Sequence, residues 1–189
     1  MGVLKALAVR ARIAAAMLLF ACGTWQPDPV CAAPTTAQVE AVFLFNFSQF
    51  VEWPPQAFPE AASPIGICVL GSDPFGATLD EVVRGEVVKG RALAVRRFQH
   101  IDEVADCQIL FVSRSERERL QPILDKLKGR NILTVSDLEE FAGEGGVIGF
   151  VLLDNKIRLR VNLEAAKAAG LTLSSKLLRP AQIVGPGEP

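Results

Sequence analysis

The chain has 189 residues, of which 50% are hydrophobic and 22% are charged, and its formal net charge is −1 at pH 7. This length and composition are typical of one globular domain that buries its own core, and they exclude a disordered chain. Three of the cations, Lys5, Arg10 and Arg12, lie close to the N-terminus, so the rest of the chain is more acidic. An acidic domain has no basic face for phosphates, which argues against nucleic acid binding and against a polybasic membrane contact.

The first 32 residues have the composition of an export signal. The N-terminal cations precede an apolar stretch from Ile13 to Cys22, which is too short to anchor a protein permanently in a bilayer. The prolines that begin at Pro27 argue against the alternative, a continuous N-terminal helix buried in the core. We therefore expect residues 1–32 to be a signal peptide and the protein to function in the periplasm.

Two positions for signal removal are consistent with the sequence. Small residues precede Ala33, which predicts cleavage there and a freely diffusing domain. The alternative is a loose lipobox before Cys22, in which residues 1–21 are removed and Cys22 carries a lipid anchor. The rest of the chain is predicted to contain a linker (33–36), one α/β domain (37–184) and a disordered tail (185–189).

A long helix is predicted at the start of the domain, from Ala37 to Trp53, with Thr36 as its N-cap and Pro54 as its stop. Compact apolar runs then alternate with helix-like stretches, and Ser115 with Glu118 and Ser136 with Glu139 have the spacing of capping boxes. The predicted strands are 65–70, 92–98, 108–113 and 131–135, and the predicted helices are 74–83, 101–105, 115–128 and 136–141.

The C-terminal part is expected to form an antiparallel hairpin, in which Asp154-Asn155 joins strands 147–153 and 156–161. Asn162 is a predicted cap for a helix that closes on Gly170. The fold class is therefore single-domain α/β, a mostly parallel sheet flanked by helices in flavodoxin- or Rossmann-like layers with a C-terminal antiparallel hairpin. Right-handed crossovers favour the order 2-1-3-4 for the first four strands.

Catalytic residues are scarce in this chain. His100 is the single histidine and there is no tyrosine, so a nucleophile activated by histidine would depend on one residue beside a charged turn. No G-x-S-x-G elbow is present, and Cys68, Cys107 and His100 lack the spacing of a zinc site. We expect no enzymatic activity, no metal and no cofactor.

The turn Gly71-Ser72-Asp73 follows the first predicted domain strand, where many α/β folds bind small ligands. It matches neither G-x-G-x-x-G nor a Walker motif. One interpretation is a structural turn, with Asp73 as N-cap and Pro74 at the first helical position. The other is a small-ligand site at this turn, which would make the protein a periplasmic small-molecule sensor.

Cys68 and Cys107 are the two cysteines of the domain. Cys68 lies in the middle of the first predicted strand and Cys107 directly before the third. If these strands are neighbours, the two Cα atoms fall within the range of about 4.4–6.8 Å that a disulfide needs. Export to an oxidising compartment favours a disulfide, and the alternative is a pair of buried free thiols.

A set of motifs in a fixed order resembles the YfiR family of periplasmic proteins. The first is the aromatic helix from Val42 to Pro54, VFLFNFSQFVEWP. The others, in chain order, are Ile67-Cys68-Val69-Leu70-Gly71, Asp73-Pro74-Phe75-Gly76, Cys107-Gln108-Ile109-Leu110-Phe111, Leu133-Thr134-Val135-Ser136, Gly146-Val147-Ile148-Gly149-Phe150, Arg160-Val161-Asn162 and Ser174-Ser175-Lys176-Leu177-Leu178. The resemblance covers essentially the whole domain.

The resemblance implies a non-enzymatic regulator. It implies that the protein binds the periplasmic sensor domain of a membrane-bound diguanylate cyclase, or another sensor protein, and thereby controls cyclic di-GMP and biofilm formation. An outer-membrane lipoprotein and the redox state are the implied releasing signals. Cys68 and Cys107 match one disulfide of the family, whereas a second pair expected near the 146–154 hairpin is absent, so redox switching through that pair does not carry over.

The first helix and the corner after it carry more aromatic residues than one helix face buries. One interpretation is that all of them pack into the core. The other assigns Phe45, Phe47, Trp53 and Phe58 to a surface for a partner protein or a homodimer, because exposed aromatic patches mark interfaces.

Overall fold

The computed structural model describes residues 33–185 and 187. The part of the chain from Pro34 onward forms one compact unit. The predicted signal peptide, its two cleavage positions and the lipid anchor at Cys22 lie outside the described residues, as does most of the predicted tail. Among the described residues, no helix combines the length and the apolar character that crossing a membrane requires.

A mostly parallel eight-stranded sheet forms the centre of the domain, in the order β10-β8-β7-β6-β5-β2-β4-β3. Strands β2, β4, β5, β6 and β7 run parallel to one another, and β7 and β8 form the antiparallel hairpin. The predicted α/β class and the 2-1-3-4 order are confirmed. The strands of this sheet are β2 (Ile65–Leu70), β3 (Val87–Val88), β4 (Arg91–Phe98), β5 (Ile109–Val112), β6 (Leu133–Ser136), β7 (Ile148–Leu153), β8 (Lys156–Val161) and β10 (Gln182–Ile183).

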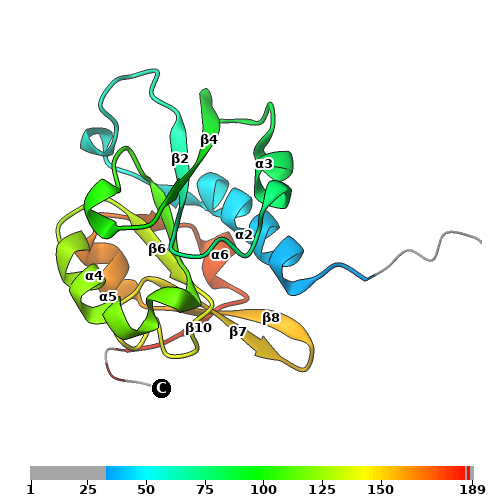
Figure 1. The fold of residues 1–189 in the computed structure, drawn as a ribbon. Coiled ribbons are helices and arrows are strands. Elements are labelled where there is room, and N and C mark those ends of the chain that lie inside the picture. The colour runs from blue at the N-terminus through cyan, green and yellow to red at the C-terminus, as the bar shows by residue number, and fades with distance from the viewer. Residues whose placement is uncertain (1–32, 186, 188–189) are drawn as a thin grey trace, which may run out of the picture. The chain divides into compact units, whose positions relative to one another are not determined.

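Helices cover both faces of the sheet, with α2 and α4 on opposite sides (Figure 1). Because side chains alternate along a strand, Ile67 and Val69 of β2 face the α2 layer, whereas Cys68 and Leu70 face the α4 layer. The helices are α2 (Thr36–Phe50), α3 (Ala77–Val83), α4 (Leu120–Leu127), α5 (Leu163–Ala168) and α6 (Ser175–Leu178), and the 3₁₀ helices are η1 (Pro55–Ala57), η2 (Ile101–Glu103) and η3 (Arg114–Arg119).

Helix α2 differs from the prediction at both ends. Its N-cap is Thr35 instead of Thr36, because the Thr35 hydroxyl accepts from the backbone of Gln38 and the Gln38 side chain accepts from Thr35 in return. The helix ends at Phe50, three residues before the predicted end. The next residues, Val51–Glu52, form strand β1, which pairs with β9 (Thr172–Leu173). This tertiary pairing overrides the helical periodicity of the sequence.

Three predicted helix starts are also corrected. Ser113, and not Ser115, caps η3, so the expected Ser115–Glu118 box does not form. Residues 136–141 form turns and no helix, because Ser136 lies in β6 and its hydroxyl donates to Val112 O while it accepts from Leu138 N. Helix α3 starts after Gly76, and Asp73 caps only the turn before it, by accepting from Phe75 N.

The Asp154-Asn155 hairpin and the Asn162 cap form as predicted. Asp154 and Asn155 both have positive φ, 50° and 58°, as a two-residue turn of the favoured twist requires. Asn162 accepts from Ala165 N at 2.9 Å and starts α5. Its amide also donates to Ala142 O, which ties the end of the hairpin to the loop before β7.

Two glycines near β7 give a test of how tightly this layer packs. A Cβ on Gly146 would overlap the ring of Phe141, which is fully buried, whereas a Cβ on Gly149 would make ordinary contacts with Ala142 at 3.7–3.8 Å. We expect Gly146→Ala to lower the free energy of unfolding by about 1–3 kcal/mol, since overpacking a dense core costs this much. Urea denaturation measures the change. The matched control Gly149→Ala should remain within about 1 kcal/mol of wild type, and equal losses in both variants would contradict the packing argument.

Candidate functional site

The disulfide predicted from the sequence is present between Cys68 of β2 and Cys107, which lies two residues before β5. The parallel pairing of β2 with β5 brings the two Cα atoms to 6.1 Å. Both residues are buried on the α4 face, beside Leu110 and Ile123. The disulfide therefore links β2 to the residues just before β5, its neighbour in the sheet.

Removal of this disulfide should destabilise the domain without unfolding it. The two cysteines are 39 residues apart, so a Cys68→Ala/Cys107→Ala variant should lose about 3–4 kcal/mol, chiefly through the freer unfolded chain. Urea denaturation of the variant, and of wild type with and without reductant, measures this loss. A variant as stable as the oxidised wild type would contradict the prediction.

The predicted aromatic surface separates into buried and half-buried members. Phe47 is 1% exposed and stacks on Phe150 with ring centroids 6.0 Å apart, so it belongs to the core and to no partner surface. Phe45, Trp53 and Phe58 are half-buried. Of the predicted set, these three are therefore available to a partner.

Trp53 and Phe58 form a corner at the edge of the sheet where the parallel strands begin. The Trp53 indole donates to Gln108 O at 3.1 Å, and the guanidinium of Arg91 lies 3.8 Å from the centre of the Phe58 ring. Glu52, Pro55, Ile65 and Lys89 complete the lining of a hollow of 440 Å³. We call this surface, consisting of Trp53, Pro55, Phe58, Lys89 and Arg91, the aromatic corner.

The corner is held by hydrogen bonds that sequence reasoning missed. Gln108 is buried, accepts from Gly66 N at 2.7 Å and donates to Ala57 O at 2.7 Å, so it ties the loop of the corner to β2. Lys89 donates to Val51 O and Arg91 donates to Ser63 O. The sequence signal that could have indicated this role was a polar residue, Gln108, between Cys107 and an apolar strand.

The Gly71 turn, the second predicted site, is filled by the protein itself. A Cβ on Gly71 would meet the side chains of Ser115 and Glu116, and Ser72 N donates to the Ser115 hydroxyl at 3.0 Å. Asp73 pairs with Arg97 at 2.6 Å. These contacts favour the structural interpretation of the turn.

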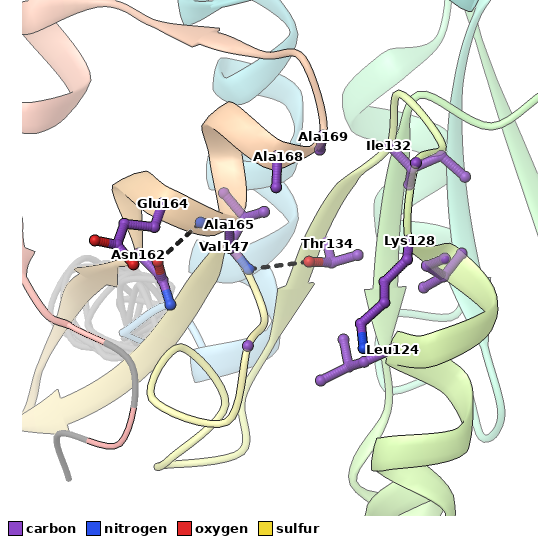
Figure 2. A pocket seen from close by; sticks show the side chains of 13 residues that line it. Leu124, Lys128, Ile132, Thr134, Val147, Asn162, Glu164, Ala165, Ala168 and Ala169 are labelled. Carbon is purple, nitrogen blue, oxygen red and sulfur yellow. Dashed lines mark hydrogen bonds between the residues drawn. The ribbon is translucent and has the colours of Figure 1, made fainter.

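A groove of 330 Å³ lies between α4 and α5 on another side of the domain (Figure 2). Leu124 of α4 and Lys128, the residue after α4, face Ala165 and Ala168 of α5 and the following Ala169 across it, and the groove is predominantly apolar. Two of its polar side chains are already bonded, since Thr134 accepts from Val147 N and Asn162 accepts from Ala165 N. The groove could take an apolar group but presents no activated nucleophile or base.

A crevice of 370 Å³ lies at the opposite edge of the sheet, where the parallel strands end. Three charged residues line it: Glu40 of α2, Arg114 after β5 and Asp137 after β6. Arg114 Nε pairs with Asp137 Oδ2 at 2.6 Å, while Asp137 Oδ1 is buried and has no hydrogen-bond partner in the protein. We call this site the carboxylate crevice.

Glu40 is the least expected member of the crevice. It is only 5% exposed, although it lies on the same helix face as Ala41, Leu44 and Phe47, which pack in the core. Burial, and to a smaller extent the Asp137 carboxylate, raise the pKa of Glu40 to about 7 against the lowering effect of Arg114. Burial also raises the pKa of Asp137, against the lowering effect of Arg114. A glutamate on the apolar stripe of a helix was the sequence signal for this site.

The fold and its surfaces define a class: a helix-flanked α/β domain with a hollow at the edge where its parallel strands begin and a crevice at the edge where they end. In the described part of the chain, no group of three or more His, Cys, Asp or Glu side chains is placed to hold a metal ion. His100 is exposed and, with Glu103, caps the short η2 helix.

Residues 37–182 match the family described as YfiR/HmsC-like, and the chain belongs to this family. Membership supports a general role as a periplasmic regulator in cyclic di-GMP signalling, in a family that is regulatory instead of catalytic. A search of curated proteins found no match.

The ionisation of Glu40 should make stability depend on pH. Between its ordinary pKa of 4.5 and about 7, the folded state keeps a proton that the unfolded state releases, so stability falls as the pH rises through this window. Glu40→Gln removes this penalty. The stability difference between variant and wild type should therefore grow by about 1–3 kcal/mol from pH 5 to pH 8.

Thermal or urea unfolding at a series of pH values measures this difference. Glu60→Gln is the matched control, because Glu60 is exposed in the loop before β2, and it should show no such growth. A Glu40→Gln difference that is constant with pH would contradict the assignment.

Proposed function

We propose that the protein is a non-enzymatic periplasmic regulator that binds the sensor domain of a membrane-bound diguanylate cyclase and restrains it. Family membership over residues 37–182 supports the signalling context. The aromatic corner supports the mode of action, because it combines half-buried aromatic rings with the guanidinium of Arg91, and aromatic residues and arginine are enriched at protein interfaces.

The corner is also preorganised. Trp53 is fixed by Gln108, and Arg91 is fixed by Ser63 O at 2.6 Å while it covers Phe58. Side chains that are already ordered lose little conformational entropy on binding, which favours specific contact with a partner. A homodimer and an outer-membrane lipoprotein as the releasing partner remain predictions, and the same corner is their first candidate contact.

The test is the cyclic di-GMP content of the source organism with and without this gene. We expect deletion to raise cyclic di-GMP, because an unrestrained cyclase synthesises more of it, and the exported wild-type chain to restore the lower level. A Trp53→Ala/Phe58→Ala variant should fail to restore it. Mass spectrometry of cell extracts measures the nucleotide, and circular dichroism of the purified variant checks its folding.

Leu153→Ala is the matched control, because Leu153 is 51% exposed at the tip of the β7–β8 hairpin, at the other edge of the sheet. It should restore the lower level fully. Unchanged cyclic di-GMP after deletion would overturn the proposed function. Full restoration by a folded Trp53→Ala/Phe58→Ala variant would overturn the assignment of the aromatic corner. If the double variant is unstable, Phe58→Ala alone provides the same test.

A further inference from the structure

The carboxylate crevice has a feature that a purely structural ion pair lacks. Glu40 is only 5% exposed, and its side chain lines the crevice. Among the described residues, Asp137 Oδ1 is the buried side-chain oxygen that has no hydrogen-bond partner in the protein. Buried carboxylate oxygens normally have donors, because an unpaired one is costly.

The charge balance around the crevice indicates the sign of a ligand. Glu40, Asp137 and Arg114 are the ionisable residues in its lining. Arg114 is committed to Asp137, with Nε 2.6 Å from Oδ2 and Nη2 donating to the backbone O at 3.1 Å. When both carboxylates are ionised, one negative charge is therefore uncompensated, and the group that would neutralise it is a hydrogen-bond-donating cation.

The rest of the lining indicates the form of that cation. Phe150, Leu152 and Ile157 of the hairpin and Pro74 after β2 provide apolar walls. The volume of 370 Å³ falls within the range of about 300–1,000 Å³ for small-molecule pockets. The crevice also lies at the carboxyl ends of the parallel strands, where α/β sheets bind their ligands.

We propose that the carboxylate crevice binds a small organic monocation, with an ammonium group between Glu40 and Asp137 and an apolar tail against Phe150, Leu152 and Ile157. This inference is independent of the partner contact at the aromatic corner. It places small-molecule binding in this crevice instead of at the Gly71 turn, where the sequence left a small-ligand site as one of two interpretations. Because α2 supplies Glu40 and the loops after β5 and β6 supply Arg114 and Asp137, a bound cation would join three otherwise separate segments.

Calorimetric titration of the purified domain with n-butylammonium chloride at pH 8 tests the proposal. 1-Butanol and butyrate are the probes of equal tail length with neutral and negative heads. We expect butylammonium to bind and the other two not to bind. Affinity should increase from pH 6 to pH 8, because the pKa of Glu40 is about 7 and the carboxylate forms over this range.

Glu40→Gln should weaken butylammonium binding by about tenfold or more, since it removes a charge-assisted hydrogen bond. Asp137→Asn is the second variant, expected to weaken it as well, and Glu60→Gln is the matched control with wild-type affinity. Equal binding of butanol and butylammonium, wild-type affinity in Glu40→Gln, or no butylammonium binding at millimolar concentrations would each overturn the proposal. None of these results bears on cyclic di-GMP restraint, which is tested separately.

Discussion

Strand β2 lies between β4 and β5, and all six of its residues are buried. A strand in this position must be covered on both faces, so its alternating side chains require one helix layer over Ile67 and Val69 and another over Cys68 and Leu70. The register of β2 against β5 also determines where Cys107 lies, and with it the disulfide. The two layers, the disulfide and the edges of the sheet all depend on this one strand.

The parallel direction of the strands gives the two edges of the sheet different chemistry. At the edge where the strands begin, Gln108 ties β2 to the loop of η1 and holds Trp53, which produces a rigid aromatic corner. At the edge where they end, Arg114 and Asp137 follow neighbouring strands and meet Glu40 of α2. A protein contact at one edge and a ligand at the other would leave both accessible together.

Glu40 shows how a binding site can be recognised by its cost to stability. A carboxyl group on a core-facing helix stripe loses hydration, and this burial destabilises the ionised form of the folded state. An alanine or leucine at this position would pack without that penalty. Residues that reduce stability in this way are concentrated at functional sites, which is the physical reason to examine the carboxylate crevice before the apolar groove between α4 and α5.

The sequence by itself determined the α/β class, the hairpin at Asp154-Asn155 and the Asn162 cap, because these depend on local periodicity and turn chemistry. The 2-1-3-4 order also followed from it, because right-handed crossovers favour this order. The Cys68–Cys107 disulfide also followed from the sequence, since it needed only the strand order and an oxidising compartment. Tertiary structure decided the end of α2, where pairing with β9 outweighs helical spacing, and the burial of Phe47 against Phe150. Only the tertiary structure brought Glu40, Arg114 and Asp137 together, because residues from three distant segments meet only when the sheet is assembled.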